Sequence, residues 1–217
     1  MSDLRELCVM CDLDGTLIDT ETCREEALKR VLVAHNASYD LAWHPYIMGR
    51  SMMEGARFLV QTLNLSVDPI TLTKEYVNAF ASAVDEKGLQ PLPHVDEVLR
   101  DWHAQGVVLW IVSGANHAYV VRALKACGWS TIFTHIVSGD PPMPAKPDPA
   151  LFQIARDTAT ATRLVAIEDA PAGIASAKAA GLPTIGLVNT RFVSRLDGDK
   201  QWFGWRDASL RDLLSLT

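Results

Sequence analysis

The chain has 217 residues, of which 48% are hydrophobic and 21% charged, and its formal net charge is −6. This composition is typical of a globular protein with a sizeable core, and the negative charge argues against nucleic acid or an anionic membrane as the main partner. The N-terminus lacks an apolar signal segment and no run reaches about 18 apolar residues, so we expect neither secretion nor a transmembrane helix. The cysteines, at positions 8, 11, 23 and 127, lack zinc-site spacing and fit reduced thiols in a cytoplasmic protein.

Short apolar runs that alternate with helical patterns predict a mostly parallel sheet. In the helical pattern that ends at Gly128, Val120, Leu124 and Cys127 share one face. Asp148 is the predicted N-cap of a further helix with Pro149 at its first position, and another helix spans 172–180. This alternation indicates a doubly wound, Rossmann-like α/β fold. The predicted strands are 7–11, 107–112, 132–137, 164–167 and 184–188.

The interval 17–88 interrupts this alternation, because it contains helical patterns only. Asp19 is the expected cap of its first helix, a second helix follows Gly49, and a third spans about 71–84. We therefore predict an α/β core of residues 1–16 and 89–217 with an α-helical cap, residues 17–88, inserted in it. The expected hinges are 17–19 and 90–93. The tail, 191–217, contains Trp202, Trp205 and a helix-like stretch at 210–216, with no assigned role.

Polar residues follow four of the predicted strands. In open α/β sheets, ligands bind beyond the carboxyl ends of the strands, so these side chains are expected at one edge of the sheet. Four carboxylates at one place repel one another unless a cation holds them, and oxygen ligands suit Mg²⁺. The residues at these strand ends are Asp12 and Asp14, then Ser113 and Gly114, then Lys146, and finally Glu168 and Asp169.

This set of side chains suits phosphoryl transfer. A carboxylate such as Asp12 can attack phosphorus to give an aspartyl-phosphate, and Asp14 can protonate the leaving oxygen and then deprotonate water. Ser113 and Lys146 can bind the remaining phosphate oxygens, while Gly15 lets backbone amides come close. The residues alone thus predict a Mg²⁺-dependent reaction at phosphorus.

The same segments resemble the four motifs of the haloacid dehalogenase superfamily, in family order. The helical insert is similar to the cap of its β-phosphoglucomutase-like branch. The segments are Asp12-Leu13-Asp14-Gly15-Thr16, Ile111-Val112-Ser113-Gly114, Lys146-Pro147-Asp148-Pro149 and Ile167-Glu168-Asp169-Ala170-Pro171-Ala172-Gly173.

The resemblance implies a role for each matching residue. Asp12 would be the nucleophile and a metal ligand, and Asp14 the general acid/base with its backbone carbonyl on the metal. Glu168 and Asp169 would complete the Mg²⁺ site. Ser113, with Gly114, and Lys146 would bind phosphate, and Arg50 of the cap is a candidate for the sugar or a distal anionic group of the substrate.

We therefore expect a phosphoric monoester hydrolase that acts on a small phosphorylated metabolite, with a sugar or polyol phosphate as the favoured class. A monomer is expected, with a dimer as the alternative.

Two other functions stay open. A β-phosphoglucomutase-like isomerase is disfavoured because 19–24 contains no His and Met52 and Met53 stand where the mutase Arg is expected. A receiver-like regulatory module is disfavoured because it needs neither a cap nor an acid at Asp14.

Near the second motif, Asn116 is expected to cap a helix, and His117 is a further candidate for substrate contact.

Overall fold

The computed structural model describes residues 3–47, 52–189 and 194–217, apart from the side chains of His44 and Pro45. Arg50, predicted to bind substrate, therefore lies outside the described residues. By its internal contacts the chain divides into two units, a core of Met1–Asp19 with Gln90–Thr217 and a helical unit of Thr20–Leu89. Among the described residues, no helix is long and apolar enough to cross a membrane.

A parallel sheet forms the centre of the core, and the described residues give it six strands in the order β3-β2-β1-β4-β5-β6. All of β1 is buried, which explains its unbroken apolar sequence. Met10 of β1 lies between Trp110 of β2 and Ala166 of β4. The strands are β1 (Leu7–Cys11), β2 (Val108–Ser113), β3 (His135–Ser138), β4 (Arg163–Glu168), β5 (Thr184–Leu187) and β6 (Lys200–Trp202).

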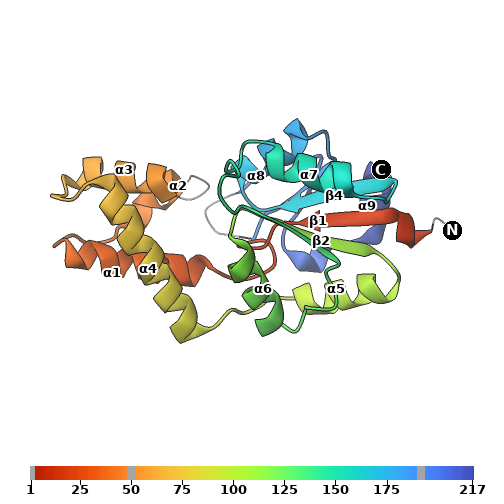
Figure 1. The fold of residues 1–217 in the computed structure, drawn as a ribbon, viewed down its shortest axis with the longest axis horizontal. Coiled ribbons are helices and arrows are strands. Elements are labelled where there is room, and N and C mark those ends of the chain that lie inside the picture. Colours follow the sequence, from red (N-terminus) through yellow and green to blue (C-terminus); the bar gives the residue numbers. More distant parts are fainter. Residues whose placement is uncertain (1–2, 48–51, 190–193) are drawn as a thin grey trace. The chain divides into compact units, whose positions relative to one another are not determined.

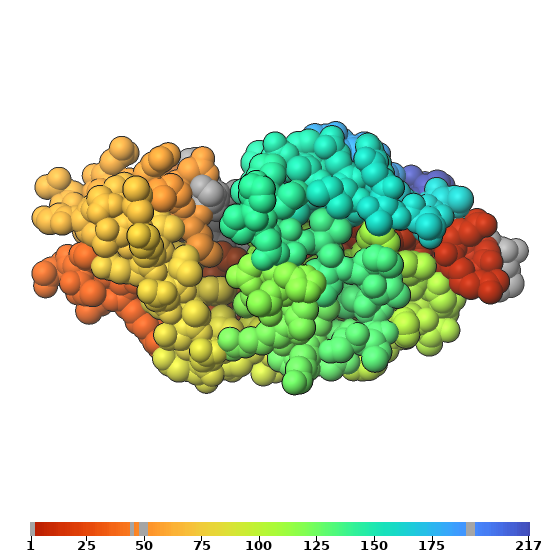
Figure 2. Space-filling view, in the orientation of Figure 1, coloured from red at the N-terminus to blue at the C-terminus, as the bar shows by residue number. Residues whose placement is uncertain are grey.

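Helices cover both faces of this sheet, which confirms the predicted doubly wound α/β fold. Helices α5 and α6 lie on one face, and α7 and α8 on the other (Figure 1). On the α7 side, Met10 and Trp110 pack with Phe152 in one buried cluster. Residues of α5 to α7, yellow-green to cyan, form much of the core surface seen in Figure 2. The core helices are α5 (Val95–Ala104), α6 (His117–Ala126), α7 (Ala150–Thr158), α8 (Pro171–Ala179) and α9 (Leu210–Leu216).

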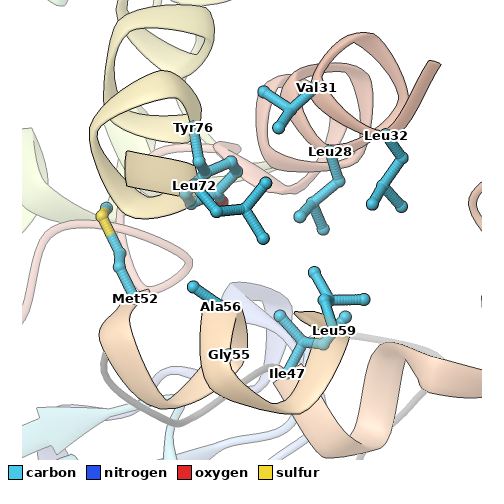
Figure 3. A pocket seen from close by; sticks show the side chains of 10 residues that line it. All are labelled: Leu28, Val31, Leu32, Ile47, Met52, Gly55, Ala56, Leu59, Leu72 and Tyr76. Carbon is cyan, nitrogen blue, oxygen red and sulfur yellow. The ribbon is translucent and has the colours of Figure 1, made fainter. Parts of the chain in front are cut away.

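Helices are the only regular elements among the described residues of the second unit, and the unit has an apolar core of its own. Asp68 caps α4 by accepting from the amides of Ile70 and Thr71, and Pro69 occupies the first turn. Side chains of α1, α3 and α4, with Ile47 of α2, point into one apolar pocket (Figure 3). The helices are α1 (Glu21–Ala34), α2 (His44–Ile47), α3 (Met52–Leu63) and α4 (Pro69–Lys87).

The two connections that lead into and out of the helical unit pair with each other. The amide of Asp19 donates to the carbonyl of Gln90 at 3.0 Å, and that of Leu92 to Leu17 at 2.9 Å. This pairing also corrects one prediction, because Asp19 does not cap α1. Its backbone is held by Gln90, and Thr20 occupies the N-cap position instead.

The local structure differs from the prediction in three further places. The third strand begins at His135 rather than at 132, because the amide of Ile132 donates to Trp129 in a turn, at 2.9 Å. Helix α7 begins at Ala150, one residue late, although Asp148 still accepts from the amide of Ala150. Strand β6 was not predicted at all.

Candidate active site

The loop after β1 carries two carboxyl groups on a tight turn. The amide of Asp12 donates to the carbonyl of Ile167 at 3.0 Å, which fixes the start of this loop against β4. Gly15 has a φ of 86°, and a Cβ atom there would lie 2.3 Å from Oδ2 of Asp169. Only glycine combines this backbone conformation with that close approach. The loops after β1 and β4 are therefore packed directly against each other.

Lys146 connects three strand ends. Its Nζ donates to Oδ1 of Asp12 at 2.7 Å and to Oε1 of Glu168 at 2.6 Å. A third hydrogen bond, of 2.8 Å, reaches the carbonyl of Val112 near the end of β2. The side chain is 11% exposed, so these charge-assisted hydrogen bonds are shielded from bulk water. Residues 134 and 22 positions away from Lys146 in sequence are thus brought to one ammonium group.

Three carboxylates beside Lys146 form a group that can hold a divalent metal ion. Oxygen atoms of Asp12, Glu168 and Asp169 all lie within 4.8 Å of one another. Asp169 is oriented by Thr16, whose hydroxyl donates to its Oδ1 at 2.9 Å. Such an all-oxygen donor set suits a hard cation. Haloacid dehalogenase-type chemistry, which the sequence suggested, uses such a metal, and these residues fit it.

Burial leaves this group of carboxylates with unbalanced negative charge. Burial raises the pKa of Glu168 to about 7, against the opposing charge of Lys146 and with the help of Asp12. Burial also lowers the pKa of Lys146, but the charges of Asp12 and Glu168 outweigh that effect and the net shift is upward. Lys146 therefore stays protonated, and a further cation is needed for all the carboxylates to ionise together.

The loop after β2 is held close to that after β3. Ser113 is buried, and its Oγ accepts from the amide of Ala115 at 3.1 Å. A Cβ atom on Gly139 would lie 2.3 Å from the carbonyl oxygen of Gly114. Asn116 caps α6 as expected, accepting from the amide of Tyr119 at 2.9 Å. Ser113, the last residue of β2, and Gly114, which follows it, thus lie at the same edge of the sheet as Asp12.

The side chain of Asp14 contacts helix α6, which follows β2. Its Oδ1 accepts a hydrogen bond of 2.7 Å from the hydroxyl of Tyr119. Cys11, which immediately precedes Asp12, offers no competing nucleophile, because complete burial raises the pKa of its thiol well above the ordinary value.

Residues 9–187 match the family model of the haloacid dehalogenase-like hydrolases. The chain belongs to this family. The match covers most of the chain and includes every predicted site residue, and it confirms the family predicted from the four motifs.

Several proteins of similar sequence are named as phosphatases. The chain is 29% identical to the fructose-1-phosphate phosphatase YqaB of Escherichia coli, over 80% of this chain and 92% of that enzyme. It is 27% identical to the bifunctional riboflavin kinase/FMN phosphatase of Arabidopsis thaliana, over 83% of this chain, but spans only 48% of that enzyme. The predicted class, a phosphoric monoester hydrolase of this family, is confirmed.

Solved structures share the fold. A β-phosphoglucomutase from Clostridium difficile aligns with a TM-score of 0.76 over 96% of this chain and 95% of that one, at 20% identity. At that identity the likeness concerns the fold, and it does not distinguish a phosphatase from an isomerase.

Three residues that contact the loop after β1 were missed in the sequence analysis. They are Tyr119 on Asp14, Trp205, whose indole N–H donates to the carbonyl of Thr16 at 2.6 Å, and Asn189, whose amide donates to the carbonyl of Gly15. Each contact spans more than 100 positions of sequence, so no local pattern signals it. For Tyr119 there was one indirect signal, its place in the first turn of a helix that follows the second motif.

Proposed function

We propose that this hydrolase is a Mg²⁺-dependent phosphomonoesterase that acts on a sugar or polyol phosphate through an aspartyl-phosphate on Asp12. The observation that carries the proposal is the contact of Lys146 with both Asp12 and Glu168, at 2.7 and 2.6 Å. It joins the expected nucleophile to the expected metal site through a cation that can also bind phosphate. Such a group of residues has no evident use in a purely structural loop.

In the first step, a carboxylate oxygen of Asp12 attacks phosphorus as the bond to the leaving oxygen breaks. Asp14 gives its proton to that oxygen, so an alcohol departs. Lys146 holds Asp12 and offsets the charge of the phosphoryl oxygens, and Ser113 and Gly114 offer them further hydrogen bonds. The product is an alcohol and a phosphate anhydride on Asp12.

In the second step, water attacks phosphorus and gives its proton to Asp14, while the bond to Asp12 breaks. Inorganic phosphate leaves, and both carboxyl groups return to their starting state. A bound Mg²⁺, held by Asp12, Asp169 and Glu168 with the backbone carbonyl of Asp14, would supply charge neutralisation and in-line orientation of the phosphoryl group.

The substrate class is supported by the relatives, since fructose-1-phosphate phosphatase activity is named for one of them. We propose that the helical unit acts as the cap that selects the substrate, because its two connections to the core pair with each other at Leu17 and Leu92. Arg50 is proposed to bind the sugar or a distal anionic group. Arg50→Ala should then raise KM for a sugar phosphate and leave KM for 4-nitrophenyl phosphate unchanged; equal effects on both would contradict this role.

A cytoplasmic location is proposed from the thiols. Cys8 and Cys11 are free and buried, which suits a reducing compartment. Labelling of the protein's thiols in a cell lysate under native and denaturing conditions tests this, and a disulfide-linked form in fresh lysate would contradict it.

The test of the proposed function is a phosphate-release screen over hexose, polyol and nucleotide monophosphates. Each is measured after chelation of metals and again with Mg²⁺, beside Asp12→Asn as control. Mg²⁺-dependent release by the wild type alone is expected. Equal release by Asp12→Asn would exclude Asp12 as nucleophile, and an isomeric hexose phosphate formed in place of inorganic phosphate would indicate a mutase.

A further inference from the structure

The general acid/base of this site is held by a side chain that none of the four motifs contains. The hydroxyl of Tyr119 donates to Oδ1 of Asp14 at 2.7 Å, a well-formed hydrogen bond in a partly buried place. The two residues are 105 positions apart, on the loop after β1 and on the first turn of α6. The contact is therefore a tertiary feature of the core, formed within one unit of the chain.

Both ends of this contact are anchored through the backbone. Asn116 accepts from the amide of Tyr119, and Asp140 accepts from that of His117 at 3.0 Å, so the first turn of α6 is fixed from two sides. On the other loop, the amide of Gly15 donates to the carbonyl of Ile18 at 2.9 Å. The phenol oxygen and the Asp14 carboxyl group are thus presented to each other by two rigid segments.

The direction of the hydrogen bond distinguishes the two oxygens of Asp14. When the carboxyl group is protonated, Oδ1 accepts from Tyr119 as the carbonyl oxygen and Oδ2 carries the proton. When it is ionised, Oδ1 still accepts from Tyr119, and a returning proton is bound by Oδ2. The same contact with Tyr119 therefore serves both steps without rearrangement.

We propose that Tyr119 is a positioning residue that orients Asp14 so that Oδ2 exchanges the proton with the leaving alcohol and then with water. This inference rests on the proposed phosphatase function. In the first step the proton moves from Oδ2 to the leaving oxygen as the phosphorus–oxygen bond breaks, and in the second it returns to Oδ2 from the attacking water. Tyr119 itself neither gains nor loses a proton.

The test compares two leaving groups in Tyr119→Phe. A sugar or polyol phosphate loses an alkoxide, which needs a proton from Asp14, whereas 4-nitrophenyl phosphate loses a stabilised phenolate, which does not. The quantity compared is kcat/KM, because it reports the step in which the leaving group departs. The ratio of the two kcat/KM values in one preparation does not depend on the fraction of folded enzyme, so a folding defect cannot imitate the effect.

We expect Tyr119→Phe to lower kcat/KM for the alkyl ester roughly tenfold to a hundredfold, a part of the usual general-acid effect. For 4-nitrophenyl phosphate it should stay within about twofold, since that step does not use the acid. Tyr46→Phe is the matched control, because it removes a hydroxyl group from an exposed ring that is stacked on Phe58, and both values should be unchanged.

An equal decrease for both esters, or none for the alkyl ester, would overturn the inference while the proposed function stands. A faster reaction of the alkyl ester would overturn it too, since it would show that Tyr119 holds Asp14 away from the substrate. Failure of the wild type to hydrolyse either ester with Mg²⁺ would instead refute the proposed function, and this inference with it.

Discussion

The buried carboxyl group of Glu168 should make the metal-free protein less stable as the pH rises. Its pKa lies at about 7 rather than at the ordinary 4.5, because the side chain is buried beside Asp12. A raised pKa means that the folded state favours the protonated form, so this contribution is complete below pH 4.5 and is lost as the pH rises through 7. At about 1.4 kcal/mol per pH unit, the loss amounts to about 3 kcal/mol. That is a large part of the stability of a typical domain, which is about 5–15 kcal/mol.

Urea unfolding in EDTA at pH 5, 6, 7 and 8 (about one unit apart, within and just above the window between the two pKa values) measures most of this loss. The fluorescence of buried Trp129, Trp202 and Trp205 reports on the core unit. Glu168→Gln is the control, because an amide keeps an oxygen for Lys146 and does not titrate. The stability of the wild type should fall relative to that of Glu168→Gln by up to about 3 kcal/mol over this range.

Mg²⁺ should oppose this loss, because it binds the ionised carboxylates. At a hundred times its dissociation constant, a ligand that binds only the folded state adds about 2.7 kcal/mol, which is close to the expected deficit. The stabilisation by Mg²⁺ should therefore be larger at pH 8 than at pH 5. Parallel pH curves for the wild type and Glu168→Gln in EDTA would refute the reasoning about Glu168.

Two further predictions concern residues that support the site. Gly173→Ala should weaken Mg²⁺ binding at least about tenfold in calorimetric titration, because the added Cβ would lie 2.0 Å from the carboxyl carbon of Glu168 and displace it. This effect is expected although alanine favours a helix by about 1 kcal/mol over glycine. An affinity equal to that of the wild type would show that Glu168 is not a ligand. Trp205→Phe should cost about 1–3 kcal/mol in urea unfolding, since it leaves the buried carbonyl of Thr16 without its donor, and should lower kcat/KM; an unchanged unfolding midpoint would contradict that role.

The sequence predicted the parts of the fold that local pattern determines. Strand β1 was predicted with its observed bounds, because a fully buried parallel strand has an unbroken apolar run that ends at a polar residue. Strand β6 was missed because Lys200 and Gln201 are polar. Its place in the sheet depends on pairing with β5 and on Asp199, which accepts from the amide of Thr184 at 2.7 Å.

The residues of the candidate site also fall into those that local sequence indicates and those that only the tertiary structure reveals. The placement of Asp12, Ser113 and Glu168 at one edge of the sheet was predictable, because each stands at the carboxyl end of a strand or directly after it. Tyr119 and Trp205 were not, since their importance comes from contacts across the fold with Asp14 and Thr16. Local sequence thus indicates which residues stand at the strand ends, whereas the contacts that hold these loops depend on the tertiary structure.

The central claim, an aspartyl-phosphate on Asp12, can be tested directly by chemical trapping. The enzyme is mixed with Mg²⁺ and a substrate from the screen, quenched in acid within the first turnover and treated with borohydride, which reduces an acyl phosphate to an alcohol. Peptide mass spectrometry should then find homoserine at position 12 in the sample that received substrate and aspartate there without substrate. Phosphate release accompanied by unmodified Asp12, or by modification at Asp14 instead, would contradict the account.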